Sequence, residues 1–218
     1  MKRRSFLKTV GGAVGAATLS APSVVHAQAA VAEPTATSAM PRRPLGRTGE
    51  EVSIIGFPGL SLVHEDQEGA TAAIHDAFER GVNYFDVAPA YGRGDAEVTM
   101  GIGLQGIPRD RIFLACKTQL RDAKGAREEL ERSLERLKTD HFDLYQLHAL
   151  RQPDEVKQGL GPGGAIETFQ KAKEEGKVRF FGFSAHTTKS ALQAMRHFRF
   201  DTVMFPINFI EYHTLGFG

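Results

Sequence analysis

Cysteine and tryptophan are nearly absent from this sequence of 218 residues, which contains one cysteine, Cys116, and no tryptophan. A single cysteine excludes an internal disulfide and a zinc site built from several thiolates. The sequence also lacks a large excess of one charge, because it contains 27 Lys and Arg residues and 26 Asp and Glu residues. This near balance argues against a dedicated nucleic-acid-binding surface. The hydrophobic content of 41% is typical of a globular protein and excludes disorder throughout the chain.

The N-terminal segment has the pattern of an export signal. Residues 2–8, KRRSFLK, are basic, no charged residue occurs from 9 to 32, and residues 25–27, VHA, offer a cleavage site. The arginine pair resembles that of a bacterial twin-arginine signal. A permanent membrane anchor is a weaker alternative, because Gly and Ala dominate where Leu and Ile would be expected. We expect 1–27 to be a signal peptide recognised by the twin-arginine export machinery and 28–40 to be a linker, which gives a periplasmic protein without a stable membrane span.

After Pro41 the sequence alternates short apolar runs with helical patterns. The apolar runs are rich in β-branched or aromatic residues and are bounded by Gly, Pro, Asp or Asn, which is typical of strands. They lie at Val52–Phe57, Val82–Val87, Arg111–Thr118, Phe142–His148, Val178–Ser184 and Thr202–Phe209. The helical patterns lie at Glu68–Arg80, Asp95–Leu104, Ala123–Leu137, Ala165–Glu175 and Lys189–Phe198. Because the strands start about 30 residues apart, the pattern predicts a parallel sheet with right-handed crossovers.

Two architectures fit this alternation, an open doubly wound sheet and a closed (β/α)8 barrel. An open sheet that binds a dinucleotide should carry G-x-G-x-x-G after its first strand, and residues 56–60, GFPGL, do not match. Several predicted strands end instead in polar residues, at the edge where a barrel has its active site. These residues are Asp86, Lys117, His148, Ser184 and Asn208. A hairpin predicted around residues 46–49, GRTG, could close the barrel floor.

Side-chain alternation groups polar residues at one end of this barrel. If the strand faces that carry Asp86, Lys117 and His148 point inward, the three side chains converge at the top. Tyr91, in the loop after Asp86, can lean over the same opening. A lysine cation favours the phenolate form of a nearby tyrosine, an aspartate holds the lysine, and a histidine can orient a substrate oxygen. Such a set supplies a proton to a carbonyl oxygen that receives a hydride.

Each of these four residues also has a simpler interpretation when taken alone. Tyr91 could pack on the rim, Lys117 could extend to water, Asp86 could cap a turn, and His148 could be an ordinary histidine at a strand end. A lysine that points inward from an apolar strand is costly to bury without a partner, however. Asp86 is the natural partner of Lys117, which favours the joint interpretation.

The segments around these residues resemble the aldo-keto reductase family. Residues 82–92, VNYFDVAPAYG, are similar to its signature around the catalytic Asp and Tyr. Residues 114–118, LACKT, and 143–148, DLYQLH, resemble the segments that bear its catalytic Lys and His. Residues 44–49, PLGRTG, and 176–184, GKVRFFGFS, add further matches in the family's order.

The resemblance implies an enzyme that reduces aldehyde or ketone carbonyls to alcohols with hydride from NADPH or NADH. Tyr91 would be the general acid and Lys117 its activating neighbour. Asp86 would hold Lys117, and His148 would orient the substrate carbonyl. The family binds its nicotinamide cofactor without a Rossmann motif, which agrees with the missing glycine fingerprint.

The binding positions depart in part from the family's pattern. Ser184 matches a family serine that binds the nicotinamide amide, whereas the following Asn is Ala185 here and a family Gln on the sixth strand is Met204. By resemblance, Ser184, Met204 and Asn208 are the candidate cofactor-binding residues. Phe57 and His186 are the candidate substrate-binding residues, although His186 could equally just precede the next helix.

Six predicted strands fall about two strand–helix units short of a closed barrel. In the family, those two units bind the pyrophosphate and adenosine end of the cofactor. We therefore expect residues 41–218 to form a C-terminally truncated barrel with open edges on its first and sixth strands.

Two rival functions stay open at this point. A metal-dependent barrel hydrolase could use His148 and His186, but it would want H-x-H on the first strand, where residues 52–56 read VSIIG, and we expect no metal site. A non-catalytic exported domain that only binds a partner is the second.

Overall fold

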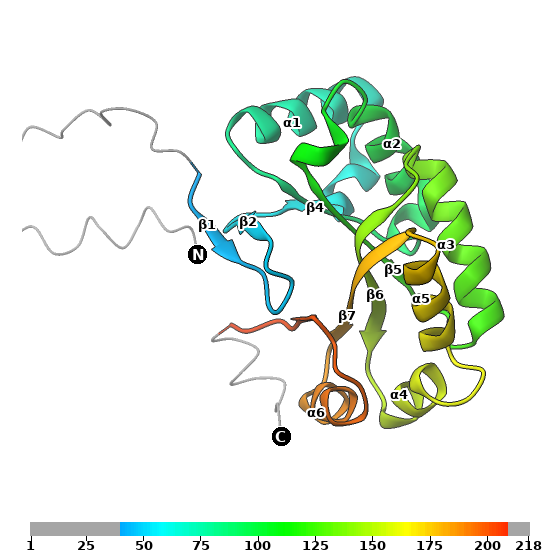
Figure 1. Cartoon of the computed structure of the whole chain (residues 1–218). Coiled ribbons are helices and arrows are strands. Elements are labelled where there is room, and N and C mark those ends of the chain that lie inside the picture. The colour runs from blue at the N-terminus through cyan, green and yellow to red at the C-terminus, as the bar shows by residue number, and fades with distance from the viewer. Residues whose placement is uncertain (1–39, 209–218) are drawn as a thin grey trace, which may run out of the picture. The chain divides into compact units, whose positions relative to one another are not determined.

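Residues 40–208 are the part of the chain that this computed structural model describes, and strands alternate with helices along them (Figure 1). The predicted signal peptide, 1–27, and the predicted linker up to residue 39 lie outside the described residues. Six strands form one sheet in chain order, and every neighbouring pair is parallel. They are β3 (Phe57–Pro58), β4 (Tyr84–Asp86), β5 (Phe113–Thr118), β6 (Phe142–Leu150), β7 (Val178–Ala185) and β8 (Thr202–Met204). This arrangement is a partial (β/α)8 barrel, as predicted.

Helices cover the outer face of this sheet, and five of them agree with the predicted ranges to within one residue at each end. The helices are α1 (Gln67–Glu79), α2 (Asp95–Gly103), α3 (Ala123–Leu137), α4 (Pro153–Leu160), α5 (Ala165–Glu174) and α6 (Thr188–His197). Asp122 caps the N-terminus of α3, where its carboxylate accepts a hydrogen bond of 2.8 Å from the backbone N–H of Gly125. The sequence analysis missed α4, although proline at its first position and a capping box of Gln152 and Glu155 mark its start.

The first predicted strand, Val52–Phe57, is wrong as a single element. Its beginning belongs to β2 (Glu51–Ser53), which pairs antiparallel with β1 (Arg42–Pro44) in the predicted hairpin. The chain then bends, because the Ser53 hydroxyl donates to the carbonyl of Ile55 at 2.7 Å. Barrel strand β3 begins only at Phe57, opposite Phe85. The sixth predicted strand is shorter than expected, since β8 ends at Met204.

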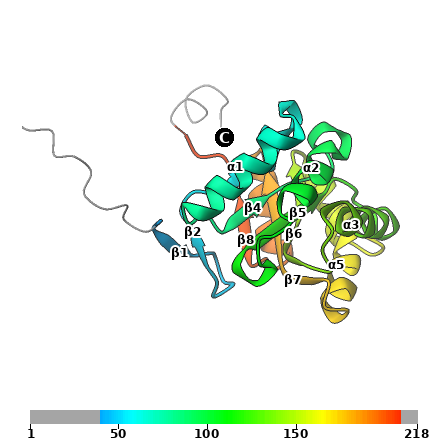
Figure 2. The same ribbon diagram turned by 90° about the horizontal axis from the view of Figure 1, so that it is seen from above.

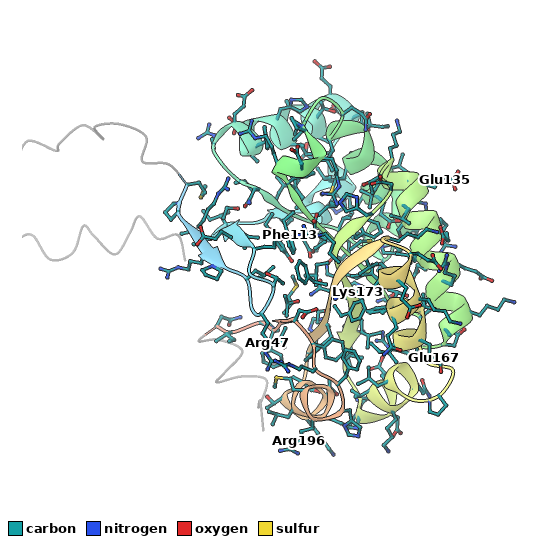
Figure 3. The ribbon with its side chains drawn as sticks, in the orientation of Figure 1. Arg47, Phe113, Glu135, Glu167, Lys173 and Arg196 are labelled. Carbon is teal, nitrogen blue, oxygen red and sulfur yellow. The ribbon has the colours of Figure 1, made fainter. Side chains whose placement is uncertain are left out.

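Two apolar layers enclose the sheet. The large outer layer lies between the strands and the helices, and the predicted stripe of α3 (Ala126, Leu130, Leu134 and Leu137) is buried there. A smaller inner cluster contains Phe113, Ala115 and Leu144, together with Val52 of the hairpin. Figures 1 and 2 show α3 and α5 on the outer side of β5 to β7, with the hairpin on the opposite side. Figure 3 shows Phe113 inside the curve of the sheet and Glu135 on the outer surface of α3.

The edge strands β3 and β8 each have one partner among the described strands. A cavity of about 550 Å³ lies on the inner side of the sheet, and residues of both edge strands line it. Val203 and Met204 of β8 are 43% and 37% exposed. In the range 40–208, no helix combines the length and the apolar character needed to cross a bilayer.

Candidate active site at the carboxyl ends of the strands

The predicted inward faces of the strands are confirmed by the packing of their neighbours. On β5, Phe113 and Ala115 belong to the inner cluster, whereas Leu114 and Cys116 belong to the outer layer. Lys117 therefore points inward from the carboxyl end of β5, beside Gln146 of β6. Asp86 is the last residue of β4 and lies opposite Ala115.

Lys117 is the centre of the site. Its side chain is 1% exposed, and its ammonium nitrogen Nζ pairs with Oδ1 of Asp86. The same nitrogen lies 3.3 Å from the carbonyl oxygen of Val87 and 3.4 Å from the hydroxyl oxygen of Tyr91. Tyr91 begins a short 3₁₀ turn after β4, and the centre of its ring is 5.2 Å from Nζ. The structure thus brings together Asp86, Lys117 and Tyr91 as predicted.

His148 completes this group from β6. Its ring meets the ring of Tyr91 edge to face, with centroids 5.6 Å apart and an interplanar angle of 88°. Burial, together with the nearby cations Lys117 and Arg121, lowers the pKa of His148 to about 3, and burial is the largest cause. The imidazole is therefore neutral at neutral pH. Its Nδ1 atom is buried and has no hydrogen-bond partner among the described residues.

Burial and charge act in opposite directions on the pKa values of the buried Asp86–Lys117 pair. Burial raises the pKa of Asp86, while Lys117 opposes that rise. Burial alone would lower the pKa of Lys117, but the Asp86 carboxylate and Tyr91 outweigh it, and the pKa of Lys117 is raised. Burial also raises the pKa of Tyr84 well above 10, with Asp86 as the next cause, so this second phenol near Asp86 stays protonated.

The predicted binding residues lie at different places around this centre. Phe57 and Met204 line the inner cavity together with Asp86. Ser184 is 6% exposed at the carboxyl end of β7, and its hydroxyl oxygen accepts a hydrogen bond of 2.7 Å from the backbone N–H of Ala149. His186 follows β7 and is exposed, but it is close enough to His148 to lower the pKa of that imidazole. Asn208 is exposed four residues beyond the end of β8.

Three further polar residues surround the site but were not predicted. Gln146 is 1% exposed, and its Oε1 atom has no partner among the described residues. The sequence could have indicated that Gln146 lies near the site, because it precedes His148 by two residues and both therefore share the inward face of β6. Arg121 lies in a loop and Glu155 lies in α4. No periodic pattern in the sequence predicts that either side chain is close to the site. The described residues contain no group of three or more His, Cys, Asp or Glu side chains that could hold a metal ion.

Comparison with known proteins gives a consistent result. The model of the aldo/keto reductase family matches residues 59–215. An uncharacterized oxidoreductase of Bacillus subtilis is 34% identical over 158 residues, which cover 67% of this chain and 49% of that protein. The L-galactose dehydrogenase of Arabidopsis thaliana is also 34% identical over 158 residues, with coverages of 65% and 47%.

A solved structure gives the same result. The holo form of an aldo-keto reductase from Bacillus halodurans superposes with a TM-score of 0.68 at 30% identity, and the match covers 77% of this chain and 58% of that one. The chain spans about half the length of the curated relatives it matches.

Proposed function

The chain belongs to the aldo/keto reductase family of oxidoreductases, and on that basis we propose that its half-barrel carries the catalytic group of an enzyme that reduces aldehydes or ketones to alcohols. The observation that carries the proposal is the position of Lys117. A fully buried ammonium group lies between the carboxylate of Asp86 and the phenol of Tyr91, with a neutral imidazole beside the phenol. A buried titratable group with a specific charge partner is a candidate functional residue, and the carboxyl ends of barrel strands are where the active sites of this fold lie.

Each residue has a distinct task in this reaction. Tyr91 donates the proton from its Oη atom to the carbonyl oxygen as negative charge develops there. Lys117 stabilises the phenolate that remains, and Asp86 keeps the ammonium group in place. The neutral His148 can donate a hydrogen bond to the same carbonyl oxygen without competing for the proton.

NADPH or NADH, when bound, would supply the hydride. Ser184 fits a carboxamide, because its oxygen already accepts from Ala149 and its O–H is left to donate. Met204 and Phe57 give the inner cavity an apolar wall that suits a nicotinamide ring. Asn208 follows β8 and is exposed, so it can reach a ligand at the same edge of the sheet.

The test of the proposed reaction uses two proteins, this chain and a chimera in which two strand–helix units of a family member complete the barrel. Oxidation of NADPH or NADH is followed by absorbance in the presence of small aldehydes and ketones. Carbonyl-dependent oxidation by the chimera is the expected result. The proposal is contradicted if the chimera folds and binds the cofactor but none of the aldehydes and ketones tested causes the cofactor to be oxidised.

Residues 28–218 alone are expected to bind NADPH weakly or not at all. Charge-assisted hydrogen bonds to phosphate groups are the strong contacts of such a cofactor. No Lys or Arg follows β8 in the sequence as far as residue 218. The edges of β3 and β8, each of which has one partner among the described strands, should also promote association between copies. Fluorescence titration with NADPH and size-exclusion chromatography check both points, and a soluble monomer with micromolar affinity would show that six strands suffice.

We also propose that the protein is exported to a bacterial periplasm through its twin-arginine signal, which lies outside the described residues. Replacement of Arg3 and Arg4 by Lys should leave the precursor in the cytoplasm, because the export machinery reads the arginine pair. Cell fractionation and immunoblotting measure the distribution. Export that continues unchanged in the double variant rules out the twin-arginine route.

A further inference from the structure

One guanidinium group joins the strand ends that carry Lys117 and His148. Arg121 lies in the loop between β5 and α3, and its side chain is 11% exposed. Its Nη1 atom donates to the carbonyl oxygen of Thr118 at 3.4 Å, and its Nη2 atom donates to the carbonyl oxygen of His148 at 2.7 Å. The same side chain therefore contacts the main chain of β5 just after the lysine and the main chain of β6 at the histidine.

Arg121 is itself held by Glu155 in the first turn of α4. Nη2 lies 3.1 Å from Oε1 of Glu155. The other carboxylate oxygen accepts backbone hydrogen bonds from Arg151 and Gln152, at 2.6 and 2.8 Å. The Glu155 carboxylate thus links the guanidinium group to the backbone of residues 151–152. Arg121 is therefore connected to both ends of the segment 148–152, directly at His148 and through Glu155 at the other end.

The contact made by Arg121 falls on a strained part of β6. Ala149 has φ of +57°, in the left-handed region that residues with a side chain seldom adopt, and the pairing of β6 with β7 shifts register between Leu147 and Leu150. The peptide group between His148 and Ala149 is held at both ends. Arg121 binds its oxygen, and the hydroxyl of Ser184 binds its N–H. A strained conformation persists only where its surroundings determine it in this way.

We propose that Arg121, held in place by Glu155, is a positioning residue that fixes the peptide group after His148 and so aims the imidazole at the carbonyl oxygen protonated by Tyr91. This inference rests on the proposed function. Arg121 acts through His148 and is not itself in contact with the reacting atoms.

Charges around His148 support this assignment. The cations that act on its imidazole come from β5 (Lys117), from the loop after β5 (Arg121) and from the loop after β6 (Arg151), and each lowers the pKa of His148. His186 after β7 acts in the same direction, and the ring of Tyr91 meets that of His148 edge to face. Loss of Arg121 therefore removes both a mechanical contact and one cation, and the two effects can be measured separately.

The decisive experiment compares Arg121→Met with Arg127→Met in the full chain. Arg127 is a matched control, because it lies on the outer surface of α3, away from the site, and also makes hydrogen bonds to a carboxylate. Its guanidinium group donates two of them to Glu175. Hydrogen exchange at the Ala149 amide is measured by NMR, with Leu144 as the reference for global opening. We expect exchange at Ala149 to become about tenfold faster in Arg121→Met alone, because a charge-assisted hydrogen bond to its peptide group is lost.

Two conservative variants separate position from charge. Arg121→Lys keeps the positive charge but loses the planar guanidinium group with its paired donors, so hydrogen exchange at Ala149 should still become faster. Because the charge remains, the NMR signal of the His148 imidazole should stay that of a neutral ring down to acidic pH. Glu155→Gln should increase the exchange rate at Ala149 less than the Arg121 variants do. The amide oxygen of the new side chain can still accept hydrogen bonds from the backbone N–H groups of Arg151 and Gln152. The His148 signal is identified by its absence in His148→Gln.

The proposal fails if the exchange at Ala149 in Arg121→Met and in Arg121→Lys equals that in Arg127→Met. If Arg121→Met does not fold, Arg121→Lys decides alone. In the chimera with a completed barrel, Arg121→Lys should lower kcat more than it changes KM for the carbonyl. The exchange measurement needs no activity, so absent carbonyl reduction by the chimera would overturn the proposed function and leave the positioning result intact.

Discussion

Tyr91→Phe in the chimera with a completed barrel is expected to lower kcat for carbonyl reduction by about 100-fold or more, which is the usual contribution of a general acid. The change removes the proton donor and keeps the ring. Lys117 loses one contact of 3.4 Å but keeps Asp86 and the carbonyl oxygen of Val87. The edge-to-face contact with His148 also remains, since it involves only the ring. We therefore expect the variant to fold normally and to bind cofactor as the parent does.

Tyr145→Phe is the matched control for this experiment. Tyr145 lies on the same sheet but points into the outer apolar layer, and its buried hydroxyl has no partner among the described residues. Removal of that hydroxyl should leave kcat nearly unchanged and should not reduce stability. Steady-state kinetics with NADPH and one good carbonyl substrate measure both variants. Turnover near the parent's in Tyr91→Phe would exclude Tyr91 as the acid.

Much of the fold follows from periodicity, because each helix of a barrel buries one stripe and each strand has an inner and an outer face. The stripe on α3 and the inward position of Lys117 are both local properties of the sequence. The partnership of Lys117 with Asp86 was also predictable, since a buried ammonium group needs a nearby carboxylate and few were available.

The remaining features depend on contacts between residues far apart in the chain. The strand predicted to end at His148 continues to Leu150, because the hydroxyl of Ser184, 35 residues away, accepts the N–H of Ala149. The bend after Ser53 likewise depends on the side chain of Asn83, which accepts a hydrogen bond of 2.7 Å from the backbone N–H of Ser53. No pattern in the sequence reveals such pairs, so both strand ends were misplaced.

Lys117→Met is expected to destabilise the chain by about 3–5 kcal/mol at neutral pH, because it leaves the Asp86 carboxylate buried without its partner. Carbonyl reduction in the chimera should also fall, with the residual activity displaced toward alkaline pH, since the cation that favours the phenolate is gone. The matched control is Lys177→Met. Lys177 forms an ion pair of 2.6 Å with Glu131 on the outer surface, and its loss should cost about 0–1 kcal/mol.

The pH dependence of this loss has a definite sign. In the parent, the raised pKa of Lys117 adds stability at every pH below the ordinary value of 10.5, and that stability is lost only as pH rises through the pKa of the folded state. In Lys117→Met, the two influences of Lys117 that lower the pKa of Asp86 disappear, so burial raises that pKa further. In the folded variant this carboxyl then binds a proton more tightly than in the unfolded chain, so its contribution to stability increases as the pH falls.

Urea unfolding of the parent and of Lys117→Met at pH 5 and pH 8 measures this dependence, and the stability difference between them should be smaller at the lower pH. Asp86→Asn in the same background removes the unpaired charge while keeping the shape of the side chain. The double variant should therefore recover much of the lost stability and lose the pH dependence, although it regains no activity. A difference that is the same at both pH values, or a double variant no more stable than Lys117→Met, would show that the two side chains are not coupled as the structure indicates.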